Sequence, residues 1–434
     1  MDVADVKIWG VAAGAVAWND ATGIATFEYY PRFKNFNWDI APLQMPVNAP
    51  QTIFSFAALR KKADPAFDTF KGLPGLLADT LPDRYGNELI NLWLAQQGRA
   101  PNSMNPVEML CFTGTRGMGA LEFEPTALKE SKRTFAIEID SLVDMAQQML
   151  SKRKKFAANL QQDEKNAMME ILRIGTSAGG ARPKAVIAWN EKTGEVKSGQ
   201  TNAPQGFEHW LIKLDGVSDV QLGASRGYGR VEMAYYNMAT ACGIEMMPSR
   251  LLEENKRAHF MTKRFDREGS DIKHHIQTFC ALKHFDYNLI TSFSYEQLFQ
   301  TMRELKLSYP AASQMYRRMV FNVLARNCDD HTKNFSFRLK QGAEWELAPA
   351  YDVCHAYKPQ HKWVSQHALS INSKRNNITR ADLLATAKAV SIKNAADIID
   401  EVNTVVRKWK HFADAVKVSP ALRDEILKTL VKLK

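Results

Sequence analysis

The sequence predicts an α+β protein built as two lobes, in which strands prevail first and helices prevail later. Short stretches of alternating apolar and polar residues, separated by turn residues, continue to about residue 266. Beyond about residue 290, helical patterns dominate and surround one polar loop with a hairpin, at 326–347. We therefore expect a β-rich N-terminal subdomain over 1–150, a strand-rich lobe with one helix over 151–266, and an all-helical lobe over 267–434 that carries the polar loop.

Length and composition place the chain among globular proteins. It has 434 residues, of which 45% are hydrophobic, and this is enough for two or three domains. No apolar run is long enough to span a bilayer and no secretory signal is evident, so we expect a cytoplasmic protein without membrane contact. Five scattered cysteines without paired metal spacing fit reduced thiols. The net charge of +10 permits an anionic partner, but no DNA- or RNA-reading motif is recognisable.

The first 150 residues favour a separate β-rich unit. Strands are expected at 7–11, 14–18 and 24–29, and helices at 87–94 and 140–150. Two glycine-rich stretches in this unit invite comparison with phosphate-binding loops. Neither is followed by a helix that begins with Lys-Ser/Thr, so we predict turns there instead.

The second region contains groups suited to a phosphate ligand. The stretch 174–184 combines glycines with a terminal lysine and precedes a strand at 185–189. Glycines let a backbone approach phosphates closely, although this stretch alone also fits an ordinary flexible loop. Lys213 lies in an apolar strand, where an ammonium group needs an anionic partner or must reach solvent. Glu232, near the start of the next helix, could pair with Lys213 or could simply favour that helix end.

The most informative stretch is the polar loop that follows an apolar helix end. Asp329 and Asn334 are five residues apart, which is the spacing of the base and the metal-binding amide in a protein-kinase catalytic loop. Lys333 between them could meet a γ-phosphate. Asp352, just beyond the hairpin, takes the place of a kinase's second metal-binding carboxylate, although the usual Phe-Gly pair does not follow it. Taken singly, these residues also fit a solvated turn and a cap, but their order around a hairpin favours the kinase interpretation.

The order of the elements also matches the plan of a kinase. A strand at 259–266 lies where a kinase joins its lobes and where a backbone segment can bind adenine. Helices are expected at 295–305, 312–325, 380–390, 395–416 and 421–433. We therefore predict a bilobal protein-kinase-like fold of the α+β class.

The sequence resembles the HipA-type serine/threonine kinase toxins of bacterial toxin–antitoxin modules over nearly its whole length. The strongest matches are 329–334 with Phe335 and Ser336, Tyr351 with Asp352, Ile212 with Lys213, 263–266, and the glycine pair Gly179 and Gly180. The stretches 72–82 and 117–120 look like the family's preceding domain. Two features differ from the family pattern. Ala-Arg-Pro precedes Lys184 where Ala-Gln-Glu is expected, and Thr176 stands beside Ser177.

The resemblance implies a role for each matching residue. Asp329 would be the general base, and Asn334 and Asp352 would hold Mg²⁺. Lys213 would meet the α- and β-phosphates of ATP, with Glu232 as its partner. The remaining nucleotide-side residues would be the phosphate loop (Gly179, Gly180, Ala181, Arg182, Pro183 and Lys184), the adenine hinge (Lys263, Arg264 and Phe265) and, around the catalytic loop, His331, Lys333 and Tyr351. Ser177 would be the autophosphorylated serine, whose modification ejects the phosphate loop and silences the kinase.

The resemblance also implies cofactors and partners. The cofactors would be ATP and Mg²⁺. The partners would be a HipB-like helix-turn-helix antitoxin and operator DNA bound through that complex. The protein substrate would be an aminoacyl-tRNA synthetase, glutamate-specific in the best-known relatives, and its phosphorylation would cause growth arrest and persistence.

Other functions remain open from the residues alone. A metal-dependent hydrolase could use Asp329, Asp330, His331, Asp352 and His355, but it leaves Lys213 and the glycine loop without a role. A catalytically silent kinase fold could act as a DNA co-repressor, and ATP binding without phosphate on Ser177 would favour it. Small-molecule phosphotransferases share the Asp and Asn of the loop.

Overall fold

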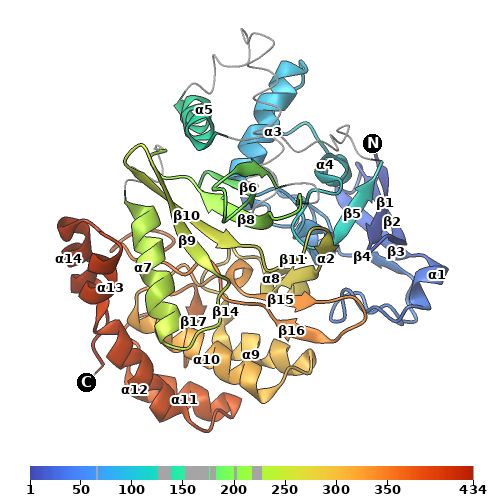
Figure 1. Cartoon of the computed structure of the whole chain (residues 1–434). Coiled ribbons are helices and arrows are strands. Elements are labelled where there is room, and N and C mark those ends of the chain that lie inside the picture. The colour runs from blue at the N-terminus through green and yellow to red at the C-terminus, as the bar shows by residue number, and fades with distance from the viewer. Residues whose placement is uncertain are drawn as a thin grey trace. The chain divides into compact units, whose positions relative to one another are not determined.

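The computed structural model describes residues 1–64, 67–125, 138–151, 175, 182–199, 203–217 and 227–433. Strands prevail in the N-terminal part and helices in the C-terminal part, which confirms the predicted α+β class (Figure 1). The chain divides into two compact units. The first unit comprises Met1–Gly229, Arg250–Ile276 and Lys340–Gly342, and the second comprises Arg230–Ser249, Gln277–Leu339 and Ala343–Lys434. Each unit is therefore assembled from separate segments of the chain.

The first unit opens with an antiparallel five-stranded sheet. Its strands are β1 (Val3–Ile8), β2 (Val11–Asn19), β3 (Ile24–Tyr29), β4 (Ile53–Ser55) and β5 (Leu121–Glu124), in the order β4-β3-β2-β1-β5. Alternate residues of β1 are buried, namely Ala4, Val6 and Ile8, as the two-residue period of a strand with one covered face requires. β5 pairs with β1 although several helices separate them in the sequence, so this subdomain closes on itself.

Helices of the N-terminal region connect and cover the sheets. They are α1 (Pro31–Lys34), α2 (Gly75–Ala78), α3 (Arg84–Gln96), α4 (Pro106–Thr113) and α5 (Ile139–Ser151), with a 3₁₀ turn η1 at Ala57–Leu59. Asp83 caps α3, because its Oδ1 accepts a hydrogen bond from the Gly86 amide at 2.8 Å. Asn105 caps α4 in the same way through the Glu108 amide, also at 2.8 Å. These caps explain where both helices begin.

A second five-stranded sheet carries the strand lysine that the sequence singled out. Its strands are β6 (Lys184–Trp189), β7 (Val196–Ser198), β8 (Glu208–Lys213), β9 (Ser249–Glu254) and β10 (Arg257–Lys263), in the order β7-β6-β8-β10-β9. A short hairpin of β11 (Arg267–Glu268) and β12 (Ile272–Lys273) follows β10. One buried apolar cluster contains Leu89 of α3, Val143 of α5 and Ile212 of β8. The N-terminal helices therefore share a core with this sheet.

The second unit is built mainly of helices. They are most of α7 (Tyr228–Ala241), α8 (Phe279–Lys283), α9 (Tyr295–Glu304), α10 (Tyr309–Leu324), α11 (Arg380–Val390), α12 (Ala395–Val406), α13 (Trp409–Ala415) and α14 (Pro420–Thr429). The continuous helix predicted at 395–416 is wrong, because α12 ends and α13 begins within it. At this break Trp409 is fully buried and its Nε1 donates to the Arg423 carbonyl at 2.9 Å.

Short strands and a turn complete the second unit around the polar loop. β13 (His275–Thr278), whose second half belongs to this unit, forms a small sheet with β15 (Ser336–Leu339) and β16 (Trp345–Leu347). β14 (Phe293–Ser294) pairs in parallel with β17 (Leu369–Ser370), and η4 (Thr332–Asn334) is a 3₁₀ turn. The hairpin of β15 and β16 follows the polar loop, as the sequence predicted.

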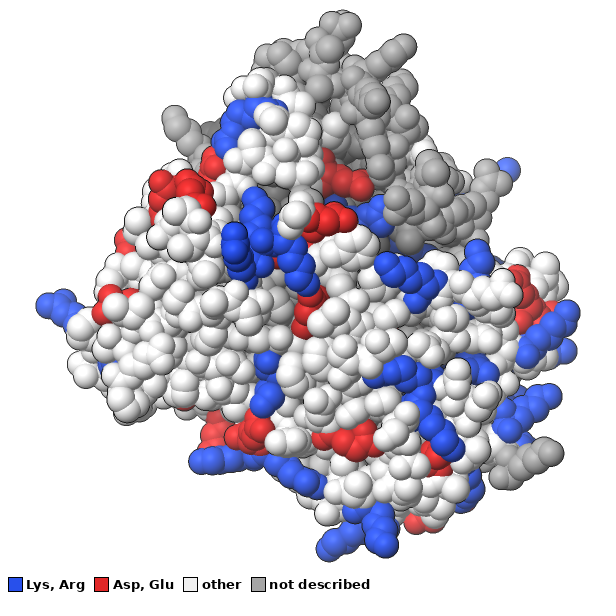
Figure 2. Space-filling model, turned by 180° about the vertical axis from the view of Figure 1, so that it is seen from behind, with Lys and Arg blue, Asp and Glu red and all other residues white. Residues whose placement is uncertain are grey.

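Charged side chains are spread over the surface. On the face drawn in Figure 2, Lys and Arg form several groups that Asp and Glu side chains interrupt. In the part of the chain that the structure describes, every helix is too short or too polar to cross a membrane.

Candidate active site

The polar loop begins where α10 ends. Arg326, just beyond the helix, adopts a left-handed backbone with a φ of 55°, which turns the chain. The next residues pair with the chain beyond the hairpin. The Cys328 amide donates to the Ala356 carbonyl, and the Ala356 amide donates to the Arg326 carbonyl, each at 3.0 Å. These two hydrogen bonds tie the loop to the segment that contains Asp352.

The side chain of Asn334 is oriented by the loop itself. Asn334 ends the turn η4, and its Nδ2 donates to the backbone carbonyl of Asp329 at 2.6 Å. His331 caps this turn, because its Nδ1 accepts the Lys333 amide at 3.2 Å. Since the nitrogen end of the Asn334 amide is bound to the loop, the oxygen end points away from that carbonyl. An amide oxygen is a ligand that suits a hard cation.

Asp352 has a left-handed backbone with a φ of 55°, a conformation that residues other than glycine adopt at a cost. The two residues before Asp352 are each held by a hydrogen bond to another segment. The Ala350 amide donates to the Glu245 carbonyl at 2.8 Å, and the Tyr351 hydroxyl donates to the Lys333 carbonyl at 2.7 Å. These contacts explain how the strained conformation persists, and the second one places Asp352 beside the loop.

The three residues predicted for catalysis and metal binding come together at one site. Burial raises the pKa of the Asp329 carboxyl, and the negative charges of Asp352 and Asp330 raise it further, while neighbouring histidines oppose the shift. The protein crowds this carboxyl, yet 46% of the side-chain surface stays exposed, so a substrate can reach it. Asn334 and Asp352 line one and the same cavity.

Two further predicted residues lie close to Asp329. The Nε2 of His331 is 3.9 Å from the Oδ1 of Asp329. The Nζ of Lys333 lies 5.1 Å from the centre of the Tyr287 ring, where the ring face attracts a cation. The Tyr287 ring also contacts the His331 imidazole. The His331 imidazole thus lies beside the Asp329 carboxylate, and Lys333 and His331 share the Tyr287 ring as a neighbour.

A buried ionic network lies behind the loop, and sequence analysis did not anticipate it. The carboxylate of Asp330 accepts hydrogen bonds from the Tyr295 hydroxyl, the Ala368 amide and the His367 Nδ1, each at 2.8 Å. Burial disfavours a charged imidazole, but the Asp330 carboxylate outweighs it and raises the pKa of His367 to about 10. The loop is therefore anchored by an ion pair. His367 is 37 residues from Asp330, so no local sequence pattern indicates this ion pair.

The ligand set of the hydrolase alternative does not assemble. Asp330 is engaged in the buried network, and the Nε2 of His355 lies 2.9 Å from the Thr429 hydroxyl. Among the described residues, no three His, Cys, Asp or Glu side chains are arranged to hold a metal ion. Asn334 and Asp352, which line one cavity, each carry a side-chain oxygen, the kind of group that suits a hard cation.

The predicted phosphate loop is described only at its end. Ser177, Gly179, Gly180 and Ala181 lie outside the described residues. The Arg182 guanidinium lies 4.3 Å from the centre of the Tyr228 ring, and the Pro183 carbonyl accepts the Leu214 amide at 3.0 Å.

Lys184 was expected to bind phosphate, and in the structure its ammonium group pairs with a carboxylate. Its side chain is only 2% exposed, and its Nζ lies 3.1 Å from the Oδ2 of Asp83, the residue that caps α3. A buried ammonium needs such a partner.

Lys184 and Lys213 are directly opposite each other on β6 and β8, so their side chains leave the same face of the sheet. Lys213 lies 5.9 Å from the centre of the Phe260 ring and belongs to the first unit, whereas Glu232 belongs to the second, so their pairing stays a prediction.

The predicted adenine hinge follows the end of β10. The Arg264 amide donates to the His209 carbonyl at 2.9 Å, and its guanidinium binds Asp266. The Lys263 ammonium pairs with Glu208. A nucleotide contact by Arg264 would therefore use its backbone carbonyl, because its amide and side chain are engaged within the unit.

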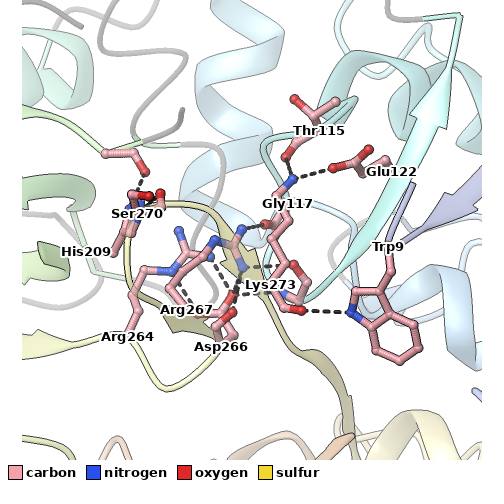
Figure 3. Close-up of polar contacts among 12 residues, drawn as sticks. Trp9, Thr115, Gly117, Glu122, His209, Arg264, Asp266, Arg267, Ser270 and Lys273 are labelled. Atoms are coloured by element: carbon pink, nitrogen blue, oxygen red, sulfur yellow. Dashed lines mark hydrogen bonds and ion pairs between the residues drawn. The ribbon is translucent and has the colours of Figure 1, made fainter. Parts of the chain in front are cut away.

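The residues after the hinge form a second buried ionic network (Figure 3). The fully buried carboxylate of Asp266 accepts hydrogen bonds from Arg264 at 2.8 and 2.6 Å, from Arg267 at 2.6 Å and from the Gly119 amide at 2.8 Å. Arg267 also donates to the Gly117 and Gly119 carbonyls at 3.0 and 2.9 Å. Burial alone would raise the pKa of Asp266, but the two arginines hold it well below its usual range.

A neighbouring ion pair extends this network. The Nζ of Lys273 lies 2.6 Å from the Glu122 carboxylate and 2.8 Å from the Thr115 carbonyl, and the Trp9 Nε1 donates to the Lys273 carbonyl at 2.8 Å (Figure 3). The hinge and the hairpin after it are thus fastened to the N-terminal subdomain by charged groups from both. The sequence pattern indicated none of these long-range partners, and the adenine-binding role of this segment stays a prediction.

Two protein-family models match the chain. The family model of the HipA-like C-terminal domain matches residues 176–409, and that of the HipA N-terminal domain matches residues 4–124. A search of curated protein sequences found no match.

Two solved structures are similar to the chain. The first is the complex of the Shewanella oneidensis MR-1 toxin–antitoxin system HipA and HipB with operator DNA, at 16% identity over 98% of this chain and 96% of that chain, with a TM-score of 0.66. The second is the Helicobacter pylori proinflammatory kinase CtkA, at 13% identity over 51% of this chain and 88% of that chain, with a TM-score of 0.33. The first likeness shows a shared fold, and the second is too weak to support an argument. Because one family model alone covers more than half of the 434 residues, the chain belongs to the HipA family.

Proposed function

We propose that this chain is a protein serine/threonine kinase that uses ATP and Mg²⁺ and acts as the toxin of a toxin–antitoxin module. The observation that carries the proposal is the gathering of Asp329, Asn334 and Asp352. The Asn334 amide binds the Asp329 backbone at 2.6 Å, and the charge of Asp352 acts on the Asp329 carboxyl. A base beside two oxygen ligands is what phosphoryl transfer to a hydroxyl requires.

Each of these residues has a distinct task in the proposed reaction. The exposed Asp329 carboxylate accepts the proton of the attacking hydroxyl, and its raised pKa brings it closer to neutral pH, where a base is most effective. The Asn334 amide oxygen and the Asp352 carboxylate are hard oxygen donors, so they fit Mg²⁺. When bound, Mg²⁺ neutralises the negative charge of the phosphates. Lys333 and His331 supply positive and polar groups beside the loop, and Lys213 supplies an ammonium group in the first unit.

The biological setting of the proposal follows from the family. The similar Shewanella protein forms a complex with HipB and operator DNA. We propose a HipB-like antitoxin and operator DNA as partners of this chain, in the cytoplasm. The proposed substrate is an aminoacyl-tRNA synthetase such as glutamate–tRNA ligase, whose phosphorylation arrests growth. Phosphorylation of its own Ser177 would silence the kinase.

The test is phosphate transfer by the purified chain. After incubation with ATP and Mg²⁺, mass spectrometry should find phosphate on Ser177 in the wild-type protein. Asp329→Ala should reduce transfer by about 10²- to 10⁴-fold, the usual contribution of a general base. It should keep the wild-type unfolding temperature, because the side chain is half exposed.

Glu344→Ala, which removes an exposed carboxylate from the following hairpin, is the matched control and should transfer phosphate normally. Undiminished transfer by Asp329→Ala would refute the assignment. ATP binding without any transfer by the wild-type chain would favour the co-repressor function.

A further inference from the structure

A cavity in the second unit lies behind the residues proposed to hold the metal. Its lining combines apolar residues with polar ones, which include Arg318, Asn327, Asn334 and Asp352. Three buried polar atoms of this lining have no hydrogen-bond partner, namely Nε and Nη2 of Arg318 and Oδ1 of Asn327. Buried polar atoms without partners are rare in proteins, so this cluster needs an explanation.

Arg318 is the unusual member of the lining. It sits in the buried part of α10, and the whole residue is only 6% exposed. Burial lowers the pKa of its guanidinium only to about 10, so the group stays charged at neutral pH. A charged group inside a protein is costly unless its donors are used. One donor is used, because Nη1 binds the Ala348 carbonyl at 2.9 Å.

That one hydrogen bond acts on the segment that leads to Asp352. The Ala348 amide donates to the Ser336 carbonyl at 3.1 Å, and Ala350 is held by Glu245 at 2.8 Å. Arg318 therefore adds a third attachment to a stretch that ends, four residues after Ala348, in the strained backbone of Asp352. A strained residue keeps its conformation only while its surroundings determine it.

The remaining donors of Arg318 belong to the cavity. Nε and Nη2 lie on one edge of the guanidinium, the edge that binds two acceptors side by side. Among the acceptors of the same lining are the Asn327 Oδ1, which lacks a partner, and the oxygens of Asn334 and Asp352. Where several polar groups line a cavity, a water molecule can bridge those that are too far apart for a direct hydrogen bond.

We propose that Arg318 is a positioning residue for the metal-binding pair Asn334 and Asp352. Its Nη1 fixes the Ala348 carbonyl, and its free edge orders water that supports the two ligand side chains from behind. The inference rests on the proposed kinase function, because it assumes that this pair binds Mg²⁺.

The test compares Arg318→Met and Arg318→Lys with the wild-type chain and with Arg317→Met. Arg317 is the neighbouring arginine of α10, and it binds the Cys242 carbonyl at 2.8 Å and Glu401 at 2.7 Å, outside the cavity lining. The probe is Mn²⁺ in the presence of a non-hydrolysable ATP analogue, followed by electron paramagnetic resonance. This readout does not depend on phosphate transfer, and a merely structural arginine would not change it in folded protein.

Arg318→Met should weaken Mn²⁺ binding about 10- to 100-fold, the usual effect of removing a group that supports metal ligands. Arg318→Lys keeps one donor for Ala348 and should lose less, and Arg317→Met should bind as the wild type does. Unchanged Mn²⁺ affinity in folded Arg318→Met overturns the proposal. If circular dichroism shows that variant to be unfolded, unchanged affinity in Arg318→Lys overturns it instead. Failure of the wild-type chain to bind Mn²⁺ with nucleotide would contradict the kinase function itself, so the two failures are distinguishable.

Discussion

The Asn334 side chain binds the backbone carbonyl of Asp329 through its nitrogen, at 2.6 Å. The proposed base and a proposed metal ligand are thus parts of one hydrogen-bonded turn. Asn334→Asp keeps an oxygen ligand but removes the donor, so the turn loses its internal bond. We expect phosphate transfer to fall about 10-fold or more, the equivalent of one lost hydrogen bond to a partly buried acceptor. Asn377→Asp, at an exposed position with a left-handed backbone, is the control and should transfer normally. Equal rates of phosphate incorporation in both variants would contradict this role of the donor.

The ion pair between His367 and Asp330 makes stability depend on pH. The pKa of His367 is raised in the folded state to about 10, from an ordinary value of 6.5. Its stabilising contribution is therefore complete below pH 6.5 and is lost as the pH rises towards 10. The unfolding free energy of the wild-type chain, measured in denaturant, should fall over this window.

The matching variant is His367→Gln, which removes the charge but leaves Asp330 buried. Breaking one side of a buried ion pair costs about 3–5 kcal/mol at neutral pH. The variant should also lose the decline in stability between pH 6.5 and 10. His411→Gln changes an exposed histidine and should behave as the wild type does. A wild-type curve that stays flat across the window would show that the pair is not charged.

The network at Asp266 predicts a large loss of stability when its central carboxylate is neutralised. Asp266→Asn removes the carboxylate that both buried guanidinium groups, of Arg264 and Arg267, contact directly. We expect a loss of about 3–5 kcal/mol in the free energy of unfolding, measured by chemical denaturation. Glu268→Gln, in the same hairpin but 62% exposed, should change it little. Similar curves for the two variants would mean that the arginines find other partners.

Variants of Lys184 can distinguish a structural role of this lysine from a nucleotide-binding role. Its ion pair with Asp83 predicts that Lys184→Met and Asp83→Asn are coupled by about 0.5–3 kcal/mol in a double-mutant cycle of unfolding free energies. The ion pair of Lys197 and Glu195, which is much more exposed than that of Lys184 and Asp83, should show a coupling of about 1 kcal/mol or less. If Lys184→Met instead raised the KM for ATP without affecting stability, the original phosphate-loop assignment of this lysine would be right.

Local patterns were sufficient for most of the fold. The alternation at 14–18 and 24–29 falls within β2 and β3, and the helical periods at 295–305 and 312–325 correspond to α9 and α10. The break before Trp409 escaped prediction because neither proline nor glycine marks it. It depends on the burial of one indole against a later segment of the chain.

In the candidate site, too, local sequence patterns indicated some residues, whereas contacts between distant residues were not predicted. Asp329, Asn334 and Asp352 could be selected from the sequence because all three lie within one loop and the hairpin that follows it, and their roles stay predictions. The distant partners of Lys184, Asp266 and Asp330 were not found, because tertiary folding brings these groups together. Arg264 and Arg267 are near Asp266 in the sequence, but no local pattern shows that this cluster is buried. Asp83 is 101 residues from Lys184, and Gly119 is 147 residues from Asp266. No pattern in a short window can show that such groups meet, and the charge of Lys184 alone suggested a phosphate rather than a carboxylate.

Segments of the two units alternate along the chain, so a truncated protein cannot contain one complete unit alone. A fragment that stops at Gly229 would contain β6, β7 and β8 but would lack β9 and β10, which complete the same sheet. The edge of β8 that β10 normally covers would then be open to pairing with other chains, a common route to aggregation. Truncation products of this protein should therefore precipitate rather than report on either unit, and a circularly permuted gene would be needed to make the first unit from one piece.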